Sequence, residues 1–429
     1  MWVSIIQYRG ADYVAQLSDE PLEPTRASEQ YQIRLPDKIS RIVLSVDCIG
    51  IRGIQFVDHN SNPTSDGSPW YEILDVRDSV LEIYVKSDGL FMGSIQLDSS
   101  CPPTYRVWSS PVPPEFYPWN FDRDSVLFQF RLDYIKINSH IRGILACCAS
   151  GMNSGIHGIH GLSGPSKAYR QFVDLMNRRL SIRNKCWIYF PLNEDELIQA
   201  AWIRKLRVSG SGVAIKPTLI LRTTLGRTVT FGTLTPARIA RKFEYRPLVK
   251  DGDGAISGIF HNGLDPALLY VHGFGVTCNN QHQVGPVEPS PLKLGPRFEP
   301  PADPPGQGAV VRFWYMTQAP LHGLVKVQVC RDTEQHHHPC LGLLLYYHDG
   351  HMESVGQVRW DRDLSQELWT PIYVQTGVVD GYEYMKDFRS GGPSTEFDAE
   401  LDGWQKIPEH GTIVWWFTSR LNRLIMYDD

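Results

Sequence analysis

The pattern of apolar and polar positions predicts a chain built mainly from short strands. Short apolar or alternating runs are separated by turns rich in Gly, Pro, Asn and Asp. Early runs of this kind are 41–46, 51–57, 80–86 and 126–132. The run Ile144-Leu145-Ala146 with Cys147-Cys148 is typical of a buried strand. These short elements favour an all-β architecture over an alternating α/β one.

Three later segments predict hairpins. The first pairs 218–223 with 227–232, the second pairs 341–347 with 352–356, and the third pairs 411–417 with 424–427. Asp349-Gly350 lies between the strands of the second hairpin, and Asp-Gly is favoured in turns that need positive backbone angles.

One helix is expected near 166–180. Ser166 can cap it, and Tyr169, Phe172, Val173, Met176 and Leu180 then recur at helical spacing. The residues from 196 to 206 fit either a second helix or a turn followed by a strand, because Asn193 and Glu196 form a capping-box pattern.

Proline-rich segments suggest where the units divide. Segments 101–119 and 281–309 are rich in proline, which cannot donate to a β ladder. We expect an N-terminal β unit over 1–135 and a basic central β unit over 136–280. A linker over 281–309 and a C-terminal β unit over 310–429 follow. The predicted fold is mainly β, with two or three antiparallel β-sandwich or β-prism-like units and one or two helices.

Composition excludes several classes of protein. The chain has 429 residues, of which 42% are hydrophobic and 11% aromatic, and this is too apolar for a disordered protein. No apolar run is long enough to cross a membrane as a helix, and the first residues lack the pattern of a secretory signal. The eight cysteines show no framework spacing, which favours reduced thiols and a cytoplasmic location.

Charge is distributed unevenly along the chain. Residues 1–166 carry 13 basic and 19 acidic groups, a net of −6. Residues 167–250 carry 17 basic and 5 acidic groups, a net of +12, and residues 251–429 carry 12 and 23, a net of −11. The basic middle either docks against acidic neighbours or forms a site for an anionic ligand. The lack of aromatic-interleaved basic motifs disfavours nucleic acid as a partner.

Several short sequence segments resemble those of known families. The hairpin at 225–232 and the strand at 255–260 resemble jacalin-like lectins. Residues 190–192 with 202–204, and residues 340–347, are similar to recurring phrases of fungal F-box-associated proteins. The resemblance implies lectin-type β units, and it favours a strand over 196–206.

Two histidines are the candidate catalytic residues. His157 and His160 lie in the Gly-rich segment 150–161, which we expect to be a flexible loop over a pocket. Histidine there would serve as an acid, a base or an anion donor. We expect no metal site, because the consecutive histidines 336–338 cannot all face one ion.

The candidate ligand-binding residues are aromatic rings and arginines. Trp108, Tyr117 and Trp119 lie in the first proline-rich segment, and such rings suit sugars or apolar metabolites. Arg222 and Arg227, on the basic hairpin, are further expected contacts.

Two functions remain open from the sequence. The first is an intracellular protein that binds a carbohydrate or another small metabolite through lectin-like β units, without a cofactor. The alternative is a cofactor-independent cyclase or isomerase of fungal secondary metabolism with an aromatic-lined pocket. No catalytic motif decides between them, and the sequence does not specify the oligomeric state.

Overall fold

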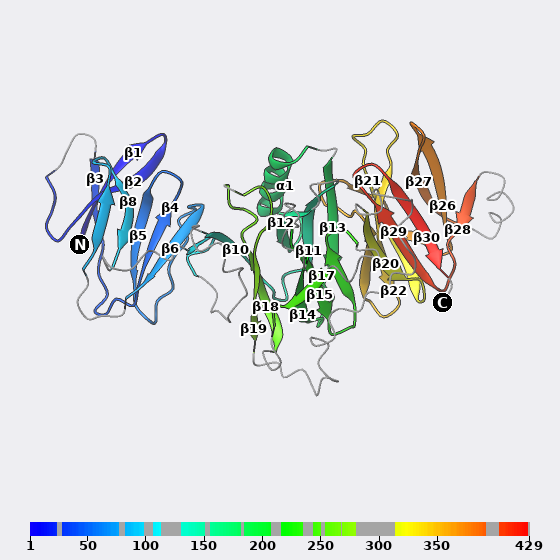
Figure 1. Ribbon diagram of the computed structural model, residues 1–429, viewed down its shortest axis with the longest axis horizontal. Helices are drawn as coiled ribbons and strands as arrows, with labels where there is room; N and C mark the ends of the chain where they lie inside the picture. The colour runs from blue at the N-terminus through cyan, green and yellow to red at the C-terminus, as the bar shows by residue number, and fades with distance from the viewer. Residues whose placement is uncertain are drawn as a thin grey trace. The chain divides into compact units, whose positions relative to one another are not determined.

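Strands dominate the fold, and most of them pair antiparallel, which confirms the mainly β prediction. The computed structural model describes residues 1–23, 28–76, 82–97, 106–112, 130–150, 155–181, 184–206, 216–234, 243–249, 254–266, 268–279, 314–391 and 403–427. The chain divides into two units (Figure 1). The N-terminal unit comprises Met1–Phe116 with Asp122–Tyr134, and the C-terminal unit comprises Tyr117–Phe121 with Ile135–Asp429.

The N-terminal unit holds three groups of strands around one apolar core. Its strands are β1 (Trp2–Tyr8), β2 (Ala11–Ser18), β3 (Ser28–Gln32), β4 (Arg41–Val46), β5 (Ile51–Val57), β6 (Trp70–Asp75), β7 (Tyr84–Ser87), β8 (Met92–Gln96) and β9 (Arg106–Trp108). β1 lies between β2 and β3, β4 lies between β5 and β6, and β7 pairs with β8. Alternate residues of β4, Ile42 and Leu44, point into a core shared with Val3, Val14 and Ile54. β10 (Phe130–Lys136) pairs its first residues with β9 in parallel.

The C-terminal unit contains the remaining strands and α1. They are β11 (Gly143–Ala149), β12 (Gly155–Leu162), α1 (Lys167–Arg179), β13 (Lys185–Pro191), β14 (Ile198–Leu206), β15 (Thr218–Thr223), β16 (Thr228–Phe231), β17 (Phe243–Pro247), β18 (Ala255–His261), β19 (Phe274–Asn279), β20 (Tyr315–Pro320), β21 (Leu324–Arg331), β22 (Cys340–Tyr347), β23 (Met352–Gly356), β24 (Asp363–Leu364), β25 (Leu368–Trp369), β26 (Ile372–Val379), β27 (Tyr382–Ser390), β28 (Trp404–Lys406), β29 (Thr412–Phe417) and β30 (Asn422–Tyr427).

These strands form several small sheets. The strand orders are β12-β11-β13, β16-β15-β14-β17, β20-β29-β30, β23-β22-β21 and β27-β26-β28. β24 and β25 pair with β21, and β18 pairs with β19. The three predicted hairpins are confirmed as β15–β16, β22–β23 and β29–β30. Residues 198–206 form strand β14, and Asn193 and Glu196 close the turn before it.

Helix α1 is confirmed by both its cap and its packing. The Ser166 side chain accepts a 3.1 Å hydrogen bond from the Tyr169 backbone N–H, which satisfies one of the unpaired donors at the helix start. Its apolar face, including Phe172 and Met176, packs against β12 (Figure 1). Gly158 of β12 permits this approach, because a Cβ there would lie 2.8–2.9 Å from both side chains.

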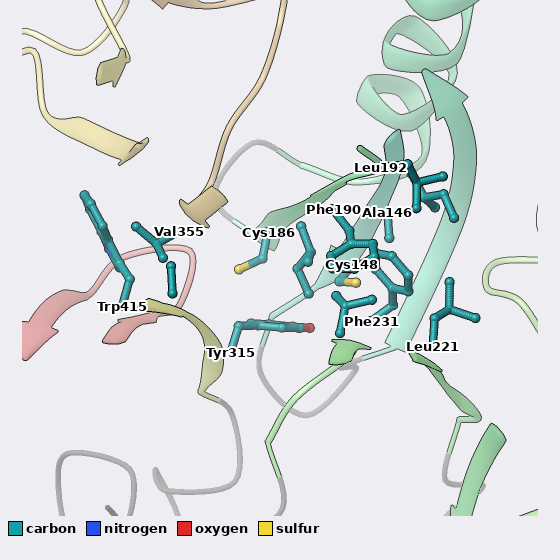
Figure 2. Close-up of a cluster of buried hydrophobic side chains, with 14 of the residues drawn as sticks. Ala146, Cys148, Cys186, Phe190, Leu192, Leu221, Phe231, Tyr315, Val355 and Trp415 are labelled. Atoms are coloured by element: carbon teal, nitrogen blue, oxygen red, sulfur yellow. The ribbon is translucent and has the colours of Figure 1, made fainter. Parts of the chain in front are cut away.

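One core joins the parts of the chain on either side of residues 281–309. Figure 2 shows Ala146, Cys148, Phe190 and Phe231 with Tyr315, Val355 and Trp415. Tyr315 of β20 is fully buried and donates a hydrogen bond from its phenol to the backbone oxygen of Ala149 in β11. Side chains from the expected central and C-terminal units therefore pack together in a single unit.

Some sequence predictions fall outside what the structure describes. Segment 281–309 lies outside the described residues, and so does segment 101–119 apart from 106–112. In the described ranges, no helix has both the length and the apolar character needed to cross a membrane.

Candidate functional site

A cavity of about 420 Å³ lies where four sheet edges of the C-terminal unit meet. The cavity is lined by residues of four edge strands, each from a different sheet: β13, β16, β20 and β23. A strand at a sheet edge carries backbone N–H and C=O groups that no neighbouring strand pairs on that side. The cavity therefore offers backbone hydrogen-bonding groups in addition to side chains.

Two of these edges are tied together at one end. The Leu234 backbone N–H, just after β16, donates a 2.9 Å hydrogen bond to the backbone oxygen of Trp314, just before β20. Beyond this bond, β16 and β20 belong to different sheets and both line the cavity. The end of β16 is thus held beside the start of β20, and the two strands bound the cavity without pairing with each other along their length.

The side chains that line the cavity are a mixture of hydroxyl, amide and apolar groups. The uncharged polar residues are Tyr189, Thr228, Thr230, Thr317, Gln318, Ser354 and Thr412. The apolar residues include Phe190, Val229, Leu234, Met316 and Pro320. Two hydroxyls serve the fold: Thr317 accepts from the Gly356 N–H at 2.7 Å, and Ser354 donates to the Tyr189 backbone oxygen at 2.6 Å. Such a lining suits a small molecule with both polar and apolar faces.

Arg227, one of the predicted ligand-binding residues, lies in the cavity wall. Its Nε and Nη2 donate to the two carboxylate oxygens of Glu196 at 2.8 and 2.5 Å, and its Nη1 donates to Glu353 Oε2 at 2.6 Å. Further bonds reach the backbone oxygens of Met352 and Pro191. A guanidinium has five N–H donors, so all of them are used within the chain. Arg227 is therefore a positioning residue that fixes the two carboxylates.

The two glutamates differ in how they are held. Burial favours a higher pKa for Glu196, but the hydrogen bonds and charge of Arg227 hold its pKa below the usual value. Glu353 shares only one oxygen with Arg227, and burial raises its pKa in spite of that charge. Its other oxygen, Oε1, has no hydrogen-bond partner among the residues that the structure describes. Glu353 is thus a buried acceptor in the cavity wall.

The other predicted ligand contacts do not join this cavity. Arg222 lies on β15 opposite Thr228 but is absent from the lining. Trp108 belongs to the N-terminal unit and has 3% of its surface exposed. Tyr117 and Trp119 lie outside the described residues.

His157 lies on a strand, which corrects the prediction of a flexible loop. Residues 155–162 form β12, and its register passes from Ile156 opposite Cys148 to Gly158 opposite Cys147. His157 is therefore the extra residue of a β-bulge, a device that re-aims a side chain. Burial, and then the charge of Lys216, lower the pKa of His157 to about 4, so its ring is neutral near pH 7.

The surroundings of His157 come from three other segments, which contain Lys216, Tyr270 and Arg179. Its ring lies 6.4 Å from that of Tyr270, and the Lys216 ammonium lies 4.2 Å above the same Tyr270 ring. Arg179, the last residue of α1, donates to the backbone oxygens of Gly263 and Asp265 in the loop after β18. This arrangement holds a neutral imidazole beside two cations.

His160 packs against different residues from those around His157. Its ring stacks on Phe172 of α1, with centroids 5.1 Å apart and an interplanar angle of 17°. It also lies 6.1 Å from the Tyr169 ring. The structure thus places His160 against the helix.

Glu353 is the cavity residue that sequence reasoning missed. Its strand was predicted, but a single glutamate in the sequence Met352-Glu353-Ser354 is typical of a solvent-facing position on a hairpin. The informative signal was an acidic residue in a strand that otherwise reads as buried, with Val355 and Gly356 following. Its partner Arg227 lies 126 positions earlier, and no local pattern links the two.

No family model matches the chain, and no curated protein does.

Proposed function

We propose that this protein binds a small, uncharged, hydroxyl-rich molecule of the carbohydrate type in the cavity beside Arg227 and Glu353. The observation that carries the proposal is Glu353, a buried carboxylate with one oxygen held by Arg227 and the other available in a cavity of about 420 Å³. Carboxylate oxygens accept strong hydrogen bonds from hydroxyl donors. A cavity of this size is in the range of small-molecule sites.

The balance of charge around the cavity supports an uncharged ligand. All five N–H groups of Arg227 donate to Glu196, Glu353 and backbone oxygens, so none is available to an anion. A ligand anion would also meet Glu353. Hydroxyl groups can instead donate to Glu353 and exchange hydrogen bonds with Thr228, Thr230 and Gln318. The resemblance of the β15–β16 hairpin to lectin hairpins agrees with this choice.

The proposal includes a cytoplasmic location. All seven cysteines in the described ranges are free thiols. Free thiols are typical of a reducing compartment.

A cofactor-independent enzyme is the second candidate, and one observation favours it. Burial raises the pKa of Glu353, which brings a carboxyl group closer to the range useful for proton transfer near neutral pH. In this version Glu353 would hold or deliver a proton at Oε1 while Arg227 fixes its orientation.

The binding proposal is tested by saturation-transfer NMR with a panel of neutral monosaccharides and disaccharides, followed by a glycan array. Thr230→Tyr would fill the cavity from its β16 wall and should abolish the transfer signal. The matched control is Thr376→Tyr on the exposed surface of β26, which should leave the signal unchanged. No signal from the parent protein, or equal loss in both variants, would overturn the proposal.

Glu353→Gln separates binding from catalysis. The amide keeps the shape and one acceptor, so a binding protein should retain measurable affinity for the saccharide. An enzyme would lose its turnover while binding persisted, because an amide cannot exchange the proton. The same saccharides, incubated with the parent protein and followed by NMR, would reveal such turnover.

A further inference from the structure

A second cavity of the C-terminal unit has a strongly charged lining. It measures about 460 Å³ and lies between α1, the start of β13 and the segment after β23. Its cationic residues are Arg170, Lys185, Arg359 and Arg362, and its carboxylates are Asp174, Glu334 and Asp361. Arg170 and Lys185 come from the basic middle of the chain. Two of the basic residues of segment 167–250 therefore line this cavity.

Two of the arginines are held by carboxylates. Arg359 donates from Nε to Asp361 at 3.0 Å, and its guanidinium lies 4.7 Å above the Trp187 ring. Arg362 pairs with Glu334 at 2.5 Å. Asp361 accepts a further bond from the Tyr169 phenol. These two carboxylates are therefore already engaged.

Lys185 is different, because it is buried with little compensation. Only 6% of the residue is exposed, and its ammonium donates to the side-chain oxygen of Asn177. Within the described ranges, no carboxylate lies within ion-pair distance of that ammonium. Burial lowers the pKa of Lys185, and the charges of Arg359 and Arg362 act in the same direction, although Cys147 and Asp361 oppose them in part. A buried ammonium bound to one amide oxygen is costly unless an anion reaches it.

Arg170 provides a second cation, and it makes no ion pair with any residue that the structure describes. It lies on the exposed face of α1 and lines the same cavity. Asp174 lies one helical turn further on and makes no ion pair in the described structure, so it opposes an anion there. Asn177 is one more turn along, and its amide nitrogen can donate while its oxygen holds Lys185. The helix thus presents an arginine and an amide toward the buried lysine.

We propose that this cavity binds the phosphate group of a small phosphorylated metabolite, with Lys185 and Arg170 as charged donors and Asn177 as a neutral one. Three donor groups from two elements suit the several oxygens of a phosphate monoester, which carries close to two negative charges at neutral pH. The volume exceeds that of the phosphate alone, and Val173 supplies an apolar wall for the organic part. This site is separate from the Arg227–Glu353 cavity and does not depend on its function.

The test is isothermal titration calorimetry of the full chain with inorganic phosphate and with glucose 6-phosphate at pH 7.5. The affinity for glucose 6-phosphate should fall at least about tenfold in Arg170→Ala and in Lys185→Gln, since each substitution removes a charged donor. Arg178→Ala is the matched control, because Arg178 is exposed on the same helix but does not line the cavity. It should leave the affinity unchanged.

The pKa of Lys185 provides a second, direct test. Lysine side-chain NMR should show the pKa of Lys185 rising when glucose 6-phosphate binds, since a nearby dianion stabilises the ammonium. If Lys185→Gln does not fold, Arg170→Ala and this NMR shift still decide the question. Absence of heat with both probes at millimolar concentration, or equal weakening by Arg178→Ala, would overturn the proposal. Equal affinity for the two probes would overturn the role of the organic part.

Discussion

Tyr169 of α1 donates a 2.7 Å hydrogen bond from its phenol to Asp361, which lies 192 positions later in the chain. The same phenol oxygen accepts a 3.1 Å bond from the Trp360 backbone N–H. Asp361 in turn holds Arg359. One phenol therefore connects α1 to the segment that follows β23, beside the charged cavity.

We predict that Tyr169→Phe lowers the free energy of unfolding by about 1–3 kcal/mol. The change removes one hydroxyl and leaves the Trp360 N–H and one Asp361 oxygen less satisfied in a buried place. Urea unfolding of the parent and variant measures the difference. Tyr382→Phe is the control, because Tyr382 is 52% exposed and should change stability little. Equal effects of the two substitutions would contradict the structural role of this phenol.

Arg227→Lys should destabilise the C-terminal unit by about 3–5 kcal/mol, despite keeping the charge. A lysine ammonium is a point donor and cannot reproduce the two parallel bonds to Glu196 together with the bond to Glu353. Two buried carboxylates would then be left with poor compensation. Chemical denaturation with fluorescence of the buried tryptophans measures the loss.

The control for Arg227 is an arginine in an exposed ion pair. Arg246 pairs with Glu244, and its side chain is 44% exposed, so Arg246→Lys should change stability by less than about 1 kcal/mol. A double-mutant cycle of Arg227→Lys with Glu353→Gln should show that the two effects are not additive. Additive effects would mean that the two residues do not act as a unit.

Much of the fold could be predicted because local pattern decides it. Ser166 and the spacing of Tyr169, Phe172 and Met176 are sufficient for α1, and Asp349-Gly350 is sufficient for the β22–β23 turn. A short run of apolar and β-branched residues likewise defines β4, in which four consecutive positions are buried. In each case the residues that determine the element lie within or beside it.

The rest depends on residues far apart in the chain. Segment 150–161 reads as a flexible loop because of its glycines, but residues 155–162 pair with β11 and pack against α1, and they form a buried strand. There Gly158 is a packing requirement and not a sign of flexibility. The Arg227–Glu353 contact spans 126 positions. The sequence could therefore suggest Arg227 as a candidate but could not show that its N–H donors are all occupied.

Glu72 of β6 should make the N-terminal unit more stable in mild acid than in mild base. Burial raises its pKa from the usual 4.5 to about 7. Below pH 4.5 the carboxyl is protonated in both the folded and unfolded states and costs nothing. As pH rises from 4.5 to 7, the unfolded chain releases this proton while the folded state retains it, so stability is lost over that interval. The full cost of about 3 kcal/mol is present above pH 7.

Glu72→Gln removes this titration and therefore tests it. Relative to the parent, the variant should become more stable by about 3 kcal/mol between pH 4 and pH 8, measured as a larger free energy of unfolding. The comparison across pH cancels the constant cost of burying the amide. Glu82→Gln, a carboxylate outside the strands of the same unit, should show no such trend. A pH-independent difference for Glu72→Gln would mean that the carboxyl titrates normally.

His157 should have the opposite effect, on the acid side of neutrality. Its pKa falls from the usual 6.5 to about 4 in the folded protein, mainly because the ring is buried and Lys216 is near. Above pH 6.5 the ring is neutral in both states. As pH falls from 6.5 to 4 the unfolded chain gains a proton that the folded state resists, so stability is lost over that interval.

His157→Gln should therefore be less sensitive to acid than the parent. Between pH 7.5 and pH 4.5 the parent should lose about 2–3 kcal/mol more than the variant, which follows from the difference in pKa. His140→Gln changes an exposed histidine before β11 and should follow the parent curve. Histidine-selective NMR of the parent should also show one imidazole that remains neutral down to about pH 4. If every histidine titrated near its ordinary value, the bulge at His157 would not hold a buried, neutral ring, and its surroundings would have to be solvated.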